Sequence, residues 1–153
     1  MKEYTLSVGT LDDAQDIQNL LYPSYFEETA YKGMTYNADN TRNQVLSWLE
    51  DLCFIARAEG KVVGVAVTRL LRTFYDEIEA DVDMFVVHKD YRGTGVARDL
   101  VNAVVANAEA NNAKVIYTSC LSGLGETNDK LYQNLYKKFG FEPLGTVMIR
   151  REI

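Results

Sequence analysis

The sequence predicts an α/β fold, a mixed β-sheet with helices packed against its faces, and three observations support this prediction. The chain has 153 residues, of which 47% are hydrophobic, so it can bury one sizeable core. The expected elements follow the order β-α-α-β-β-β-α-β-α-β-β, which is typical of one sheet flanked by helices. No internal repeat, low-complexity segment or linker divides the sequence, so residues 1–153 are expected to form a single domain.

The first third of the chain is expected to form one strand and two helices. Apolar and polar residues alternate over residues 4–8 and predict the strand. Thr10 begins a capping-box variant, and apolar residues follow it at helical spacing up to Pro23, which ends or bends this helix. Residues 39–50 predict the second helix, with Trp48 on its buried side.

The stretch between these helices, residues 22–36, is the least regular part of the sequence. It combines aromatic residues with the acids Glu27 and Glu28. Aromatic and acidic side chains on an irregular segment can line a substrate pocket. They fit equally well a loop and short helix that cover the edge of the core, and the sequence leaves both interpretations open.

The middle of the chain predicts three consecutive strands. Glu59 and Gly60 form a tight hairpin turn between the first two, and a longer connection over 71–78 leads to the third. Strands so rich in apolar residues indicate a sheet that is covered on both faces. The three strands span residues 52–58, 61–70 and 79–87.

The last third predicts two more helices and three more strands. Apolar residues at helical spacing and glycines at the expected stops define these elements. They are a helix that closes at Asn111 and Asn112, a strand over 114–119, a loop over 121–127, a helix over 128–139 that ends before Gly140, and a hairpin over 141–152.

The charge balance limits the classes of partner. The net charge is −6 and the isoelectric point is about 4.8, which argues against non-specific nucleic-acid binding because that needs a basic surface. An acidic balance suits a cationic partner such as an amine substrate. It is explained equally well by solubility alone.

Targeting and metal signals are absent from the sequence. No apolar run reaches the length of a membrane span, and residues 1–4 lack the apolar core of a signal peptide, so we expect no membrane partner and a cytoplasmic location. Cys53 and Cys120 are expected to be buried free thiols. With one histidine and two distant cysteines, no zinc site or other metal site is expected.

The strand over 79–87 leads into a glycine-bearing turn at residues 92–97. Glycines let a backbone approach a ligand without interference from Cβ, and the first amides of a helix lack partners and lie at the positive end of its dipole. The turn therefore suits a pyrophosphate, to which Arg92 and Arg98 would add charge-assisted bonds. Alone it is weak evidence, because Gly-x-Gly before a helix is often a plain loop, and it matches neither a Walker loop nor a dinucleotide fingerprint.

Two segments together resemble the GNAT N-acetyltransferase superfamily. Residues 86–97 are similar to its acetyl-CoA motif, Arg/Gln-x-x-Gly-x-Gly/Ala, which Arg92, Gly95 and Ala97 fill. Residues 135–141, Leu-Tyr-Lys-Lys-Phe-Gly-Phe, resemble the family signature Leu-Tyr-x-Lys-x-Gly-Phe. The resemblance covers essentially the whole chain and implies a GNAT-like, largely antiparallel central sheet flanked by helices.

The resemblance implies that acetyl-CoA is the acetyl donor. It implies that the backbone at the end of the strand over 79–87 binds the acetyl carbonyl and the pantetheine arm. The alternative is that this stretch is a core strand with no ligand role. The family often has Asn seven residues before the signature tyrosine, whereas this sequence has Asp129 there and Asn128 beside it. The implied donor-binding residues are Phe85, Val86, Val87, Arg92, Gly93, Thr94, Gly95, Val96, Ala97, Arg98, Asn128 and Asp129.

The resemblance also implies acetyl transfer to a primary amine of a small molecule or protein. Tyr136 matches the general acid that protonates the departing thiolate, although a core aromatic is the alternative. Glu79, Asp81 and Asp83 alternate along one strand, so they share a face and suit a wall that binds a cation or accepts a proton. Asp83 is the first candidate for the general base and Asp81 the second. The alternative is that the three acids lie on a solvated strand end. His88 is expected to be a surface residue.

Other function classes stay open at this point. One is a CoA-binding module or sensor without catalysis. Another is a toxin-type acetyltransferase that acts on aminoacyl-tRNA, against which the acidic balance argues. The acceptor is expected to be an amine, cationic in character, chosen by residues 22–36, 71–78 and 121–127, and a homodimer is compatible with the sequence.

Overall fold

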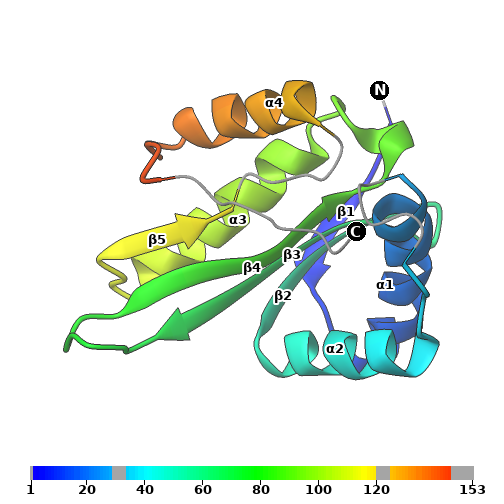
Figure 1. Cartoon of the computed structure of the whole chain (residues 1–153), viewed down its shortest axis with the longest axis horizontal. Helices are drawn as coiled ribbons and strands as arrows, with labels where there is room; N and C mark the ends of the chain where they lie inside the picture. The colour runs from blue at the N-terminus through cyan, green and yellow to red at the C-terminus, as the bar shows by residue number, and fades with distance from the viewer. Residues whose placement is uncertain (1, 29–33, 120–124, 146–153) are drawn as a thin grey trace.

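A computed structural model of the protein describes residues 2–28, 34–119 and 125–145. Its centre is a five-stranded sheet in the order β1-β2-β3-β4-β5 (Figure 1). The first four strands pair antiparallel with their neighbours, and β5 pairs parallel to β4. This confirms the predicted mixed, largely antiparallel sheet. The strands are β1 (Thr5–Val8), β2 (Leu52–Ala58), β3 (Lys61–Leu71), β4 (Glu79–Val87) and β5 (Val115–Thr118).

Helices cover both faces of this sheet, as Figure 1 shows. Two of them, α1 and α2, pack on one face, and α3 packs on the other. The predicted helices are all present, with ends that differ by a few residues. They are α1 (Ala14–Leu21), α2 (Ala38–Glu50), α3 (Val96–Ala110) and α4 (Glu126–Lys137), joined by the short helical segments η1 (Leu11–Asp13), η2 (Tyr22–Glu27) and η3 (Lys89–Tyr91).

Local sequence signals account for two of the connections. Glu59 and Gly60 both have positive φ angles, 50° and 76°, which is the backbone of the two-residue turn that suits a hairpin. At Thr10 the predicted capping box forms, because the Asp13 carboxylate accepts a hydrogen bond of 2.7 Å from the Thr10 amide. The chain then enters α1 through the short turn η1.

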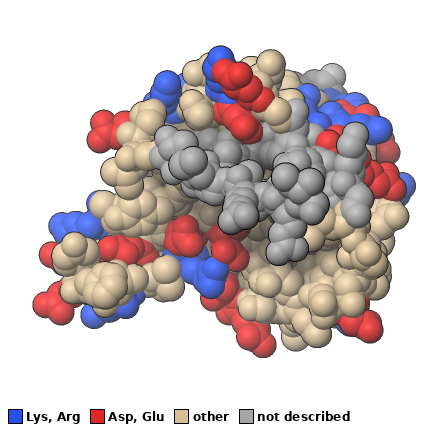
Figure 2. All heavy atoms as spheres, viewed as in Figure 1, with Lys and Arg blue, Asp and Glu red and all other residues tan. Residues whose placement is uncertain are grey.

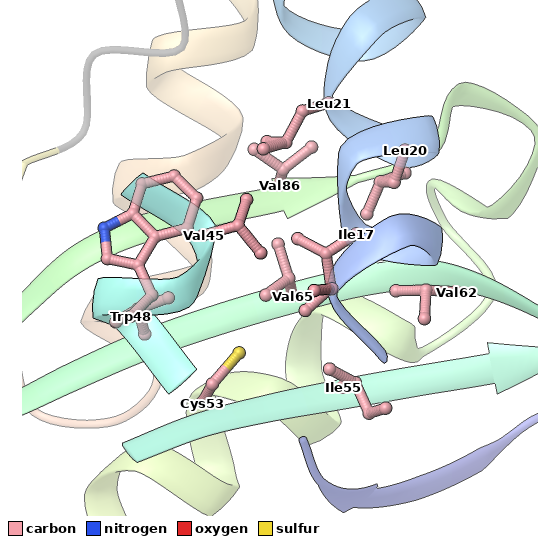
Figure 3. Close-up of a cluster of buried hydrophobic side chains, with 12 residues drawn as sticks. Ile17, Leu20, Leu21, Val45, Trp48, Cys53, Ile55, Val62, Val65 and Val86 are labelled. Atoms are coloured by element: carbon pink, nitrogen blue, oxygen red, sulfur yellow. The ribbon is translucent and has the colours of Figure 1, made fainter. Parts of the chain in front are cut away.

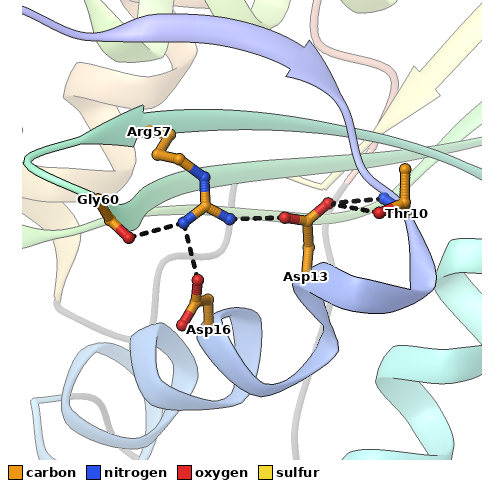
Figure 4. A network of polar contacts seen from close by, with 5 residues as sticks. All are labelled: Thr10, Asp13, Asp16, Arg57 and Gly60. Carbon is orange, nitrogen blue, oxygen red and sulfur yellow. Dashed lines mark hydrogen bonds and ion pairs between the residues drawn. The ribbon is translucent and has the colours of Figure 1, made fainter.

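One arginine ties the hairpin to the first helix (Figure 4). Arg57 of β2 donates to Asp13 at 2.6 Å, to Asp16 at 2.7 Å and to the Gly60 carbonyl at 2.7 Å. Burial opposes ionisation of Asp13, but hydrogen bonds from Thr10 and Arg57 outweigh it and lower its pKa. The charges therefore hold α1 in place over the sheet.

The core consists of two clusters, one on each face of the sheet. Figure 3 shows the cluster between the sheet and α1 and α2, in which Ile17, Val45 and Val65 are fully buried. The second lies under α3 and contains Val96 and Leu100. Both faces are therefore covered, as the apolar strands predicted.

Cys53 is a buried free thiol, as predicted. Burial raises its pKa to about 12, so it stays protonated and unreactive at neutral pH. Cys120 lies outside the described residues.

Two irregular regions differ from the rest. The stretch after α1 continues as the π-helix η2, and Tyr36 packs edge-on against Tyr22 and Phe26 with centroids 4.9 Å apart in each pair. In the predicted final hairpin, residues 141–145 have no regular secondary structure and the remainder lies outside the described residues. Most of the predicted loop 121–127 lies outside them as well.

None of the helices in the described ranges is long and apolar enough to cross a membrane.

Gly64 is closely packed between the sheet and α3. A Cβ atom there would lie 2.8 Å from Val96 Cγ1 and 3.0 Å from Leu100 Cδ1. We expect Gly64→Ala to lower the free energy of unfolding by about 1–3 kcal/mol, since α3 must move away from the sheet. Gly145→Ala is the control, because a Cβ there meets nothing within 4 Å. Urea unfolding measures both, and equal midpoints for the two variants would contradict this packing.

Candidate active site

The turn after β4 has the backbone that its glycines predicted. Gly93 and Gly95 have φ angles of 77° and 103°, in the left-handed region that glycine adopts without strain. Gly95 is the N-cap of α3, and the amide of Asp99 returns to its carbonyl at 3.0 Å. The amides at the start of α3 have no partners within the helix and carry its positive dipole end. The turn can therefore hold an anionic group.

The N-terminus closes one side of this turn, which the sequence patterns did not indicate. Tyr4 donates to Asp99 at 2.7 Å, and its hydroxyl would lie 3.0 Å from a Cβ on Gly95. Burial and the hydrogen bond to Asp99 raise the pKa of Tyr4. Lys2 donates to the Asp90 carbonyl at 2.7 Å and lies 4.4 Å from the centroid of the Tyr91 ring.

Both arginines of the turn are paired with carboxylates in this structure. Arg92 donates through Nε to the Val87 carbonyl and through Nη2 to Glu28, each at 3.1 Å. Arg98 donates to Asp99 at 2.8 Å, and its side chain is two-thirds exposed. Contact of either guanidinium with a pyrophosphate stays a prediction. The Glu28 contact joins the turn to the segment after η2.

The strand β4 changes partners along its length. It pairs with β3 from Glu79 to Val87, but its pairing with β5 ends at Val82 and Thr118. The strand β5 ends at Thr118, whereas β4 continues to Val87, as Figure 1 shows. The edge of β4 that faces β5 is therefore outside the β4–β5 ladder at Phe85, Val86 and Val87, where the sequence placed the pantetheine arm.

An aromatic group fills the angle between the end of β4 and α4. The Phe85 ring meets Tyr132 at 5.7 Å and Tyr136 at 5.9 Å between centroids, and Tyr136 meets Phe141 at 5.0 Å. Tyr136 is 3% exposed. Burial raises the pKa of Tyr132, a residue that the sequence patterns missed. The structure thus brings the predicted acid beside the predicted donor-binding strand.

The first turn of α4 holds Asp129, at which the sequence departs from the family pattern, and Asn128 beside it. Asn128 and Asp129 are half-buried there. Asn128, Tyr132 and Tyr136 are spaced four residues apart, so they lie on one face of the helix. Asn128 therefore faces the same way as the two tyrosines, and Asp129, three residues before Tyr132, is close enough for its charge to raise the pKa of Tyr132.

A β-bulge interrupts β4 where the sequence showed regular alternation. Val67 pairs with Met84 and Thr68 pairs with Val82, which leaves Asp83 as the extra residue. Before the bulge Val82 packs under α3, and after it Val86 packs under α1. Even-numbered residues of β4 thus face α3 before the bulge and α1 after it. Asp83 still meets Arg69, the cross-strand partner of Asp81, so the three acids remain on one face, and the change of face affects the residues after the bulge.

Asp83 is also held by neighbours. Trp48 donates through Nε1 to Asp83 Oδ2 at 2.9 Å, and Arg69 donates to Oδ1 at 2.5 Å. Both oxygens of this carboxylate are therefore engaged by neighbouring side chains, and its role as the base stays a prediction.

Asp81 lies on an open part of the sheet. Its neighbours across the ladders are Arg69 on β3 and Tyr117 on β5, and the next row along holds Leu71, Glu79 and Val115. Tyr117 and Val115 are 42% and 40% exposed, so the described residues leave this area uncovered. Figure 2 shows acidic and basic side chains gathered where the projecting hairpin of β3 and β4 joins the body of the molecule.

The pKa of Asp81 is raised. Burial is the main cause and the charge of Asp83 the second, while Arg69 lowers it. No described residue forms a hydrogen bond or ion pair with Asp81 within the usual distances. A carboxylate with a raised pKa and free oxygens is suited to accept a proton.

Within the described ranges, no three His, Cys, Asp or Glu side chains gather closely enough to hold a metal ion. His88 is half-buried just past β4, and its Nδ1 accepts from the Asp90 amide at 3.2 Å. It caps the turn η3, and its place outside the chemistry stays a prediction.

Comparison with known proteins gives one family and a consistent fold. Residues 50–143 match the family model described as an acetyltransferase (GNAT) domain. The chain is 26% identical to an uncharacterized N-acetyltransferase of Methanocaldococcus jannaschii, in an alignment that covers 93% of this chain and 62% of that protein. The chain therefore spans less than two thirds of that relative's length.

Solved structures of low sequence identity share the fold. Aminoglycoside N-acetyltransferase AAC(6')-Iy in complex with CoA has a TM-score of 0.73 and 15% identity, with 99% of this chain and 96% of that chain covered. A ribosomal-protein-alanine N-acetyltransferase from Brucella melitensis has a TM-score of 0.69 and 20% identity, with 98% and 99% covered. Because the family model covers more than half of the sequence, this chain belongs to the acetyltransferase (GNAT) domain family.

Proposed function

We propose that this protein transfers an acetyl group from acetyl-CoA to a primary amine of a small molecule or protein. One observation carries the proposal: β4 connects every part that the reaction needs. The glycine turn follows β4 directly. The ring of Phe85, a residue of β4, lies 5.9 Å from the Tyr136 ring between centroids, and Asp81 lies on the open face of β4. Structural neighbours that act on aminoglycosides or on a ribosomal protein support an amine acceptor.

The donor would lie along the second half of β4. Acetyl-CoA supplies the activated acetyl group as a thioester. Its pyrophosphate suits the amides of residues 93 and 95–97, while the Thr94 amide donates to the Tyr91 carbonyl at 3.3 Å. Its pantetheine amides suit the β4 backbone beyond the end of β5. Gly93 and Gly95 leave room for this approach because they have no Cβ.

The acceptor would lie over the first half of β4. Asp81 accepts a proton from the ammonium group, so that the nitrogen lone pair can attack the thioester carbon. The new C–N bond forms and the C–S bond breaks. Tyr136 then gives its hydroxyl proton to the departing thiolate, and its phenolate takes up the second proton that the nitrogen loses as the amide forms. Glu79 and Asp83 add negative charge that favours a cationic acceptor.

The activity can be tested with acetyl-CoA and a panel of amines, namely a diamine, an aminoglycoside and a lysine-containing peptide. We expect thiol release that depends on the amine, and one added acetyl group on the product by mass spectrometry. Reactions without amine are the control. Calorimetric binding of acetyl-CoA with no product from any amine would instead support the CoA-binding module, and absence of binding would contradict both.

Tyr136→Phe tests the general acid. The ring remains to pack on Phe85, but the proton donor is gone, so we expect kcat to fall by about 10²-fold or more. Tyr132→Phe is the matched control, since it lies one turn earlier and contacts the same Phe85 ring. Equal kcat values for Tyr136→Phe and the wild type would remove Tyr136 from the reaction.

Glu28→Gln tests the link between the turn and the segment after η2. Glu28 competes with a pyrophosphate for Arg92, and a partly exposed ion pair of this kind is worth about 0.5–1 kcal/mol. We therefore expect CoA to bind about two- to five-fold more tightly to the variant, measured by calorimetry. Glu27→Gln is the control. Weaker binding by Glu28→Gln would show that Glu28 helps the arginine to bind the donor.

A further inference from the structure

We propose that Asp83, with Asp51 and Trp48, holds the Arg69 guanidinium away from Asp81, and that this arrangement keeps Asp81 free to accept the proton of the incoming amine. Asp83 is thereby a positioning residue and not the base. The inference rests on the proposed function only in assigning the proton that Asp81 accepts to an amine substrate. The arrangement of the side chains stands without it.

The strand register places Arg69 and Asp81 directly opposite each other. They are Cα partners on β3 and β4, so their side chains lie on the same face about 5 Å apart at Cβ. An arginine and an aspartate in such positions ordinarily form an ion pair. That pair would lower the pKa of the carboxyl and weaken it as a base.

The guanidinium is instead engaged by two other carboxylates. Arg69 Nη2 lies 2.5 Å from Asp83 Oδ1, and Arg69 Nε lies 3.8 Å from Asp51 Oδ2. Asp51 is the C-cap of α2, and Asp83 is the extra residue of the bulge. Two separate elements therefore direct the arginine along the sheet and away from its cross-strand partner.

The core fixes the position of Asp83. Its second oxygen accepts from Trp48 Nε1 at 2.9 Å, and Trp48 is 6% exposed in the cluster under α2. Figure 3 shows the indole nitrogen directed out of this cluster. Because the indole ring is packed in the core, the direction of its N–H is fixed. Asp83 is therefore held between the Trp48 N–H and the Arg69 guanidinium.

The charges around Asp81 explain what this arrangement achieves. The described groups that share its face are Glu79 and Asp83 on β4, Arg69 on β3 and Tyr117 on β5, with Asp51 beyond the arginine. The one positive charge among them is balanced by two carboxylates. Burial and the neighbouring Asp83 raise the pKa of Asp81, and Arg69 lowers it only in part. The carboxylate therefore binds a proton more strongly than an aspartate in water does.

The test compares Asp83→Asn and Arg69→Met with the wild type. Asp83→Asn removes a like charge and releases Arg69 toward Asp81, so the titration of Asp81 should move to lower pH. Arg69→Met should move it to higher pH. Each shift should be at least about one pH unit. Carboxyl NMR of the free protein measures the titration directly, and the acid limb of kcat/KM should move in the same direction in each variant.

Arg72→Met is the control, because Arg72 is exposed, lies at the end of the same hairpin and removes the same charge. It should leave the Asp81 titration unchanged. An Asp81 titration that does not move in Asp83→Asn overturns the proposal. So does loss of the whole acid limb in Asp83→Asn, which would make Asp83 the base. If no amine is acetylated by the wild type, the proposed function fails, and the NMR titrations still decide this inference.

Discussion

The candidate site depends on one constraint: β4 is paired with β3 along its whole length but with β5 only along its first half. In the first half both edges of the strand are used, so only its side chains are available, and these are acids on an open face. In the second half one edge lies beyond the β4–β5 ladder, and the proposed donor would meet the backbone there. The strand then ends in the glycine turn that begins α3.

The bulge at Asp83 separates these two halves, and core packing requires it. Val82 must lie under α3, and Val86 must lie under α1. Strict alternation would place these two residues on the same face. One extra residue resolves the conflict, and that residue is an aspartate whose carboxylate meets Trp48 and Arg69. Asp83 thus allows both halves of β4 to pack on the core, and it also places a carboxylate beside Arg69.

The sequence was sufficient where the determinants are local. The bounds of β2 and β4, the turn at Glu59 and Gly60 and the glycine turn before α3 agree with the structure because periodicity and turn residues act over a few positions. The family resemblance rested on two short segments, and the family model over residues 50–143 confirms it. The bulge was missed because the spacing of the three acids on β4 is itself regular, and only the pairing with β3 reveals it. Contacts such as Tyr4 with Asp99 join residues 95 positions apart, and they follow from the tertiary fold.

Gly64 connects the two ends of the donor site. It is the Cα partner of Val87, the last residue of β4, and it lies against Val96, the first residue of α3. Its missing side chain therefore sets the distance from the strand end to the helix N-terminus. In the proposed donor, a fixed number of bonds separates the pyrophosphate from the thioester. In the proposed complex this glycine would act as a spacer that matches the strand end and the helix to the length of the donor, and a small displacement of α3 would misplace the reacting carbon.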